Sequence, residues 1–247
     1  MRKRFLTQLS LVSIITCCCL FGALYTADCQ AFQQNRQPVI YLLAGGNFHL
    51  TEECADLLIQ YLQGKTRYPV KKTMVRYDLT RLDELNAQGL ILITQGGVLS
   101  DAELQSLQAF VRSGKGVVGI HGATDSFDDA GEVEAYTDLI GGWFQSHPPR
   151  GEFPVTVKNT SHPITREMKN FRVRYDERYV MKLADGLDVL LTVDVDGKEI
   201  PNTWTKDYGQ GRVFYTGLGH DRTTFRNATF LSMVVRGIKW AIEDPAQ

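Results

Sequence analysis

The chain of 247 residues carries 27 lysine and arginine residues against 28 aspartate and glutamate residues, which gives a formal net charge of −1. This even balance, without a basic stripe, argues against nucleic acid as a partner. A chain of this length can bury the core of one large α/β domain, and no repeat or low-complexity tract divides it.

The first 31 residues have the pattern of a secretory signal peptide. A basic start is followed by a mainly apolar run over 9–24, and Ala31 ends a small-residue cleavage site. We therefore expect removal of 1–31 and export to the periplasm or the cell surface. A membrane anchor is the alternative, but polar residues interrupt the apolar run. Lipidation at the cysteines of 17–19 is a further alternative, although the residues before them fit a lipobox only loosely.

Cys54 is the one cysteine of five that remains after such a cleavage. A single thiol cannot form an internal disulfide, so the exported domain must be stable through its core alone. Because Cys54 lies in a predicted helix, we expect a small buried hydrophobic side chain and not a nucleophile.

In the first half of the chain, apolar runs bounded by glycines predict strands over 39–44, 70–77, 89–94 and 117–120. A helix is expected from Thr51, which would cap it, to about Gly64. A second helix follows from Ser100 to about Gly114, where Ser100 and Glu103 form a capping box. This alternation of continuous apolar strands with helices predicts an α/β fold with a mostly parallel sheet covered on both faces.

The second half of the chain has shorter and more polar elements. Strands are expected over 153–158, 187–193, 200–205 and 212–216, with a hairpin turn at Asp196 and Gly197. Helices are expected over 136–140 and 229–242, and loops over 126–134, 143–149 and 171–179. Because no linker interrupts the pattern, we expect a single domain over 38–244.

Three of the five histidines, His49, His121 and His220, directly follow predicted strands. Ligands bind at the carboxyl ends of parallel strands, so these side chains can converge at one edge of the sheet. His121 stands at a sharp turn after 117–120, the place where many α/β enzymes present a nucleophile. An imidazole there can act as general base, general acid or metal ligand. The alternative is a structural histidine packed under the next helix.

Six short motifs then resemble the ThuA-like (trehalose utilisation) family. They occur in order over about Pro38 to Glu243, as 119–123 (GIHGA), 141–147 (GGWFQSH), 162–164 (HPI), 176–179 (DERY), 201–204 (PNTW) and 209–220 (GQGRVFYTGLGH). The resemblance implies a fold similar to class I glutamine amidotransferases, a flavodoxin-like three-layer sandwich. It also implies that His121 replaces the amidotransferase cysteine, so that the chain is not a glutamine amidotransferase. The family is linked to bacterial use of trehalose and other disaccharides, often beside sugar oxidoreductases that produce 3-keto-glycosides.

The first functional hypothesis is an enzyme that processes glycosides or 3-keto-glycosides as a lyase, hydrolase or isomerase. A ketone acidifies the neighbouring C–H bonds, so a base can start elimination or epimerisation. His121 would be the base or a metal ligand, and Glu177 a general acid/base or a carboxylate ligand. Imidazoles with one carboxylate suit Zn²⁺, Mn²⁺ or a similar ion, and the expected metal ligands are His49, His121, His147 and His220. A metal-free acid/base pair is the alternative, and no nucleotide cofactor is expected.

Four aromatic residues are candidates for stacking on a sugar, with core packing as the alternative for each: Trp143, Phe144, Tyr179 and Trp204. The second functional hypothesis is a non-catalytic carbohydrate-binding or accessory protein of disaccharide utilisation. The third, a hydrolase of the amidase type, lacks a placed nucleophile, because Cys54 lies in the first helix. The expected partners are therefore a small-molecule sugar and a sugar oxidoreductase of the same pathway.

Overall fold

The computed structural model describes residues 37–46 and 49–243, and the predicted signal peptide lies outside them. From Pro38 onward the chain forms one compact unit. Its apolar runs form five adjacent parallel strands, in the order β2 (Val70–Thr73), β1 (Val39–Gly45), β3 (Ala87–Thr94), β4 (Gly116–Ile120) and β11 (Gly211–Thr216). The central strands are buried on both faces, which explains why their sequences are continuously apolar.

Four antiparallel strands extend this sheet beyond β11. Their order is β10 (Lys198–Tyr208), β9 (Asp188–Val195), β6 (Gly151–Val157) and β7 (Phe171–Asp176). The predicted hairpin joins β9 to β10, and its turn residues Asp196 and Gly197 have φ values of 53° and 78°. Two positive φ values are the conformation that a tight hairpin turn requires. A separate two-stranded sheet pairs β5 (Gly142–Ser146) with β8 (Val180–Leu183).

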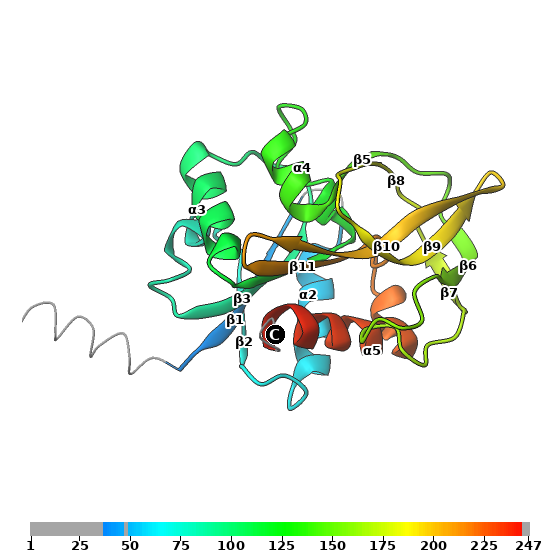
Figure 1. Ribbon diagram of the computed structural model, residues 1–247, viewed down its shortest axis with the longest axis horizontal. Helices are drawn as coiled ribbons and strands as arrows, with labels where there is room; N and C mark the ends of the chain where they lie inside the picture. Colours follow the sequence, from blue (N-terminus) through cyan, green and yellow to red (C-terminus); the bar gives the residue numbers. More distant parts are fainter. Residues whose placement is uncertain (1–36, 47–48, 244–247) are drawn as a thin grey trace, which may run out of the picture. The chain divides into compact units, whose positions relative to one another are not determined.

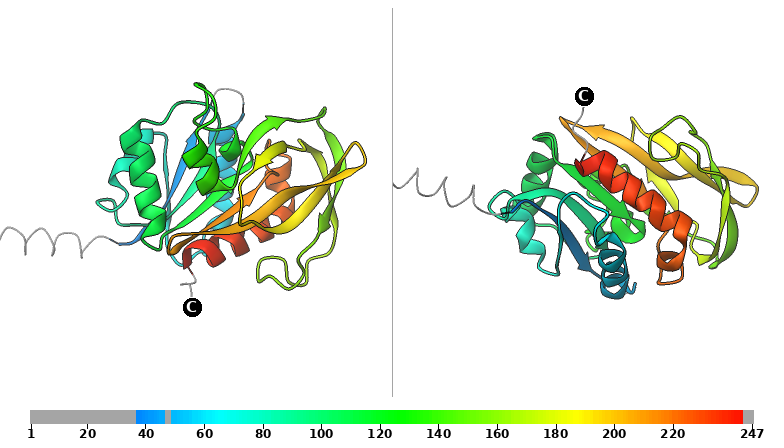
Figure 2. Two further views of the ribbon diagram at one scale, coloured as in Figure 1. Left: turned by 45° about the horizontal axis from the view of Figure 1, so that its top comes forward. Right: turned by 90° about the horizontal axis from the view of Figure 1, so that it is seen from below.

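Helices cover both faces of the nine-stranded sheet, so the unit has three layers (Figures 1 and 2). On one face, α2 (Thr51–Leu62) and α5 (Ala228–Ile238) bury Leu58 and Phe230 in one hydrophobic cluster. On the other, α3 (Asp101–Arg112) and α4 (Glu134–Ile140) bury Leu107 and Leu139 in a second. The expected α/β sandwich is therefore confirmed. Within the described residues, none of these helices has the length and apolar content needed to cross a membrane.

The antiparallel half bends back toward the parallel half. Strand β7 is the last strand of the sheet, four positions away from β11. Nevertheless the Asp176 carboxylate at the end of β7 accepts a hydrogen bond of 2.9 Å from the backbone N–H of Gly219, in the loop after β11. The sheet must curve strongly to allow this contact, and Figure 2 shows α5 lying between its two halves. The curvature brings the end of β7 to the carboxyl ends of the parallel strands.

Several local expectations were wrong. The Thr51 side chain makes no capping hydrogen bond, and Leu50 occupies the cap position. The strand expected over 70–77 ends at Thr73 and is followed by a 3-10 helix, η1 (Arg76–Arg81). The predicted loops 143–149 and 171–179 contain β5 and β7. By contrast, the capping box of Ser100 with Glu103 is confirmed.

Cys54 lies in α2 and is 1% exposed. Burial raises the pKa of its thiol to about 12, so that the thiolate is absent at neutral pH. We expect native protein treated with iodoacetamide at pH 8 to remain unmodified at Cys54, and unfolded protein to react fully. Peptide mapping by mass spectrometry would separate Cys54 from the cysteines of 17–29. Modification of Cys54 in the native state would contradict its burial.

Candidate functional site

His121 follows β4 directly, at the first position of a short 3-10 helix, η2 (His121–Thr124). Its φ of 48° is a left-handed conformation that is uncommon for residues other than glycine and that recurs at functional sites. The side chain is buried, and its Nδ1 lies 2.8 Å from the carbonyl oxygen of Gly217, after β11. A carbonyl can only accept, so Nδ1 carries the hydrogen and Nε2 faces the interior of the site.

Gly122 lets the turn at His121 approach the loops after β1 and β3. A Cβ atom at this position would lie 2.5 Å from the Thr94 carbonyl oxygen and 3.2 Å from Nδ1 of His49. We expect Gly122→Ala to lower the free energy of unfolding by about 1–3 kcal/mol and to displace His49. Gly151→Ala is the matched control, because nothing lies within 4 Å of its added methyl. Equal urea midpoints for the two variants would contradict this packing.

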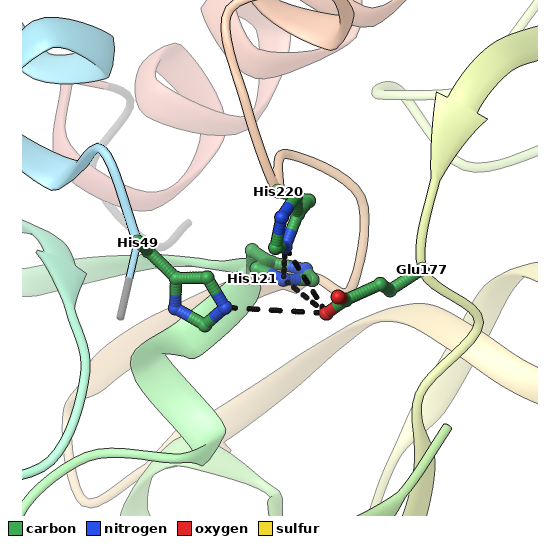
Figure 3. A group of neighbouring side chains, drawn as sticks. All are labelled: His49, His121, Glu177 and His220. Atoms are coloured by element: carbon green, nitrogen blue, oxygen red, sulfur yellow. Dashed lines mark hydrogen bonds and ion pairs between the residues drawn. The ribbon is translucent and has the colours of Figure 1, made fainter. Parts of the chain in front are cut away.

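Glu177 is the centre of a cluster that three imidazoles surround (Figure 3). Its Oε2 lies 3.1 Å from Nδ1 of His220, 3.3 Å from Nε2 of His121 and 3.9 Å from Nε2 of His49. The four residues come from the ends of β7, β11, β4 and β1, which are far apart in sequence. They offer ligand atoms that all lie within 4.8 Å of one another.

A second pair of groups lies on the Oε1 side of Glu177. Nε2 of His147 is 3.6 Å from Oε1, and Nε of Arg150 is 3.9 Å from it. Both side chains are substantially exposed, whereas Glu177 is almost completely buried. His147 therefore stands outside the group of four ligand atoms in which we expected it, at the solvent side of the cluster.

Asp176 fixes the loop that carries His220. Its buried carboxylate accepts hydrogen bonds from the backbone N–H groups of Gly219 and His220, from the Thr224 hydroxyl and from the backbone N–H of Glu177. The distances run from 2.6 to 3.1 Å. One carboxylate thus positions both His220 and Glu177. The sequence offered a signal for it, because Asp176 is adjacent to the predicted Glu177.

Burial and mutual contact set the protonation of the cluster. Burial and the neighbouring His121 and His220 lower the pKa of His49 to about 3, so His49 is neutral. Burial opposes the charged forms of His121 and Glu177 as well. Contacts with Glu177, Asp176 and the Gly217 carbonyl outweigh burial and raise the pKa of His121, and contacts with His121 and His220 outweigh burial and lower the pKa of Glu177. Glu177 is therefore a carboxylate at neutral pH, and its contact with His121 favours the protonated form of that ring.

The residues present fit a divalent metal in three respects. Oε2 of Glu177 is a buried acceptor without a hydrogen-bond donor among the described residues, although two ring nitrogens lie close to it. Loss of one proton from His121 would leave an Nε2 lone pair, with Nδ1 already held by a carbonyl as in many metal sites. Three imidazoles with one carboxylate are also a donor set suited to Zn²⁺ or Mn²⁺.

His220 is less well arranged to bind a metal than the other three residues. Its Nε2 lies 2.6 Å from Nη1 of Arg150. A guanidinium can only donate, so Nε2 accepts and the hydrogen of a neutral His220 resides on Nδ1. Coordination through Nδ1 would therefore require this hydrogen to leave and Arg150 to move. Arg150 was not predicted to be a site residue, because no local pattern indicates that its loop reaches His220.

Two of the four aromatic candidates are part of the core. The Trp204 ring is completely buried, stacks on Tyr215 with ring centroids 4.3 Å apart, and donates from Nε1 to the Ile140 carbonyl. Tyr179 is 1% exposed and packs 4.1 Å from the ring of His121. Neither ring offers a face to a sugar, so stacking roles for them are not supported.

Trp143 and Phe144 are only half-buried, at the start of β5. Nε1 of Trp143 donates to the Asp128 carboxylate, and Phe144 packs 4.4 Å from Tyr179 and 5.9 Å from His147. Phe144 therefore lies beside the exposed imidazole of the site, where contact with a substrate remains a prediction.

The family model for trehalose utilisation, ThuA, matches residues 40–241 of the chain. The chain belongs to the ThuA family. A ThuA-like protein from Parabacteroides merdae has 23% sequence identity and a TM-score of 0.72, over 85% of this chain and 92% of that one. A ThuA-like protein from Bacteroides uniformis has 19% identity and a TM-score of 0.71, over 85% of this chain and 94% of that one. None of the curated proteins compared with the chain matches it.

The same fold occurs within larger enzymes. The β-galactosidase from Rahnella sp. R3 shares 14% identity with a TM-score of 0.57, over 83% of this ThuA chain but 31% of the galactosidase. Together these neighbours show the class I glutamine amidotransferase-like fold that we expected. At such identities the likeness concerns the fold alone.

Proposed function

We propose that this ThuA protein is an exported enzyme that processes disaccharide glycosides or their 3-keto forms by proton transfer at the cluster around Glu177. One observation carries the proposal, namely that Glu177 and three imidazoles meet at the carboxyl ends of the parallel strands. Buried titratable groups with opposed pKa shifts are uncommon outside functional sites. The family description, trehalose utilisation, supports a sugar substrate.

The geometry suggests a division of roles between buried and exposed groups. His147 is about one-third exposed, and its Nδ1 lies 2.9 Å from the Pro148 carbonyl oxygen, so that Nε2 carries a lone pair. Nε2 is therefore placed to take a proton from the carbon next to a ketone. Arg150, also exposed beside Glu177, can donate to a substrate oxygen on which negative charge develops.

The proton balance is that of an elimination or an epimerisation. The C–H electron pair moves into an enolate as His147 takes the proton. In an elimination the ketone re-forms, the former C–H electron pair becomes a carbon–carbon double bond, and the bond to the glycosidic oxygen breaks. That oxygen takes up the proton from the protonated His147. A metal held by His49, His121, Glu177 and, after Arg150 moves, His220 would polarise the ketone oxygen. Buried Tyr179 and His121 keep the inner side of the site free of bulk water.

The test combines metal analysis with a substrate screen. Elemental mass spectrometry of the exported chain, before and after chelation, should find near-stoichiometric metal that falls in His121→Ala. 3-Keto-glycosides should be consumed by the native protein, and about 10²–10⁴-fold more slowly by His147→Ala. Sugar binding without turnover would instead favour the non-catalytic carbohydrate-binding protein. A metal-free protein whose melting temperature is insensitive to divalent ions would leave a metal-free acid/base site.

A further inference from the structure

Exposed apolar side chains gather at one edge of the parallel sheet. Among the described residues, seven large apolar side chains are exposed, and five of them follow β1, β2 or β3: Leu50, Met74, Val75, Tyr77 and Val98. These strands are neighbours in the order β2-β1-β3 and run parallel, so the loops after them meet at the same edge. Exposed apolar groups concentrated in this way indicate a binding surface.

A cavity of about 170 Å³ opens between these loops. Its wall combines apolar side chains with glycine backbone: Leu43, Ala44, Gly45, Gly46, Met74, Arg76, Thr94, Gln95, Gly96, Gly97 and Phe127. A second cavity, of about 480 Å³, shares Gly45, Gly46 and Met74 with the first and extends to His49. The surface therefore continues from Arg76 to His49, one of the three imidazoles of the cluster.

Among the described residues, Arg76 is the only charged one in the wall of the first cavity. Its Nε lies 3.2 Å from Oε1 of Glu103, whose buried carboxylate also accepts hydrogen bonds from the backbone and hydroxyl of Ser100. The guanidinium is thereby fixed, while its terminal nitrogens have no partner among the described residues. A Cβ atom on Gly97 would already lie 3.4 Å from Nη1, so the absence of a side chain there keeps this nitrogen accessible.

The chemistry of the cavity fits a neutral sugar ring. A hexopyranose combines an apolar C–H face with hydroxyl oxygens, and the cavity offers the exposed Met74 side chain beside the fixed N–H donors of Arg76. An anion would fit less well, because Glu103 already balances the charge of Arg76. We infer that this cavity binds the second sugar ring of a disaccharide whose first ring is held at the His–Glu cluster. The inference rests on the proposed function and defines its substrate class.

Binding of trehalose and of methyl α-glucoside, measured by calorimetry or NMR titration of the full chain, would test the subsite. The native protein should bind the disaccharide more tightly, and Arg76→Met should weaken trehalose binding roughly 10-fold or more without changing the monosaccharide affinity. Arg81→Met is the matched control, since Arg81 lies in the same 3-10 helix and pairs with Glu84 at the surface. Met74→Ala, at a side chain that is 55% exposed, should weaken trehalose binding in the same direction without loss of folding.

The outcomes separate the subsite from the reaction. An unchanged disaccharide preference in both Arg76→Met and Met74→Ala would overturn the subsite alone. A second outcome is a disaccharide preference that Arg76→Met and Met74→Ala both reduce, in a native protein that turns over no 3-keto-glycoside. This outcome would support the subsite and contradict the enzymatic proposal. Failure of the native protein to bind either sugar would overturn the subsite, whereas consumption of 3-keto-glycosides by the same protein would still support the enzymatic proposal.

Discussion

Glu177→Gln is expected to abolish metal binding and turnover while leaving the fold intact. Glutamine has nearly the shape of glutamate but no negative charge, so the three imidazoles around it would lose the one anionic group in their midst. Loss of an outer-shell partner alone costs about 10–100-fold in metal affinity, and loss of a ligand should exceed this. Equilibrium dialysis with elemental analysis measures the affinity, and far-UV circular dichroism confirms folding.

Glu152→Gln is the matched control for this variant, because Glu152 is exposed and forms an ion pair with Arg172. It should retain the metal content and the turnover of the native protein. Native-like metal affinity in Glu177→Gln would show that the carboxylate is not a ligand. Retained turnover would remove it from the proposed reaction.

Asp176→Asn is expected to cause the largest loss of stability. The Asp176 carboxylate is completely inaccessible to solvent and accepts four hydrogen bonds, so an amide NH₂ group there would face N–H donors. Hydrogen bonds to charged groups are strong, and a donor left buried without an acceptor adds its desolvation cost. We expect the free energy of unfolding in urea to fall by at least about 3 kcal/mol.

Asp207→Asn provides the control, since Asp207 is exposed on β10 and should tolerate the change within about 0.5 kcal/mol. If Asp176→Asn folds at reduced temperature, its metal affinity should also fall, because the loop carrying His220 loses its anchor. Equal stability of the two variants would mean that the hydrogen bonds at the end of β7 contribute little.

The sequence was sufficient to predict the parallel half of the fold and the positions of three site histidines. Continuous apolar runs can be buried on both faces only inside a covered parallel sheet, so β1, β3 and β4 were identified with nearly correct bounds. The residues directly after such strands must lie at the carboxyl edge. For this reason we predicted that His49 and His121 lie close together.

Strand β7 was harder to predict than β6, β9 and β10, because exposed residues separate its buried ones and it resembles a polar loop. β7 was expected to be a loop for this reason. The contacts of Glu177 with Arg150 and His147 depend on how far the sheet curves, which no local pattern encodes. The burial of Trp204 was equally unpredictable, since an aromatic ring on a half-polar strand is compatible with a core and with a binding surface.

The end of β7 lies against the loop after β11, so the site joins two parts of one sheet that are far apart in strand order. The histidines come from loops after β1, β4 and β11, whereas the carboxylate comes from the last antiparallel strand. A ligand that binds all four groups links the edge strand β7 to the inner strands β1, β4 and β11. Its binding free energy stabilises the contact between these two parts of the sheet. Ligand binding should therefore slow the opening of β7 relative to its opening in the ligand-free protein.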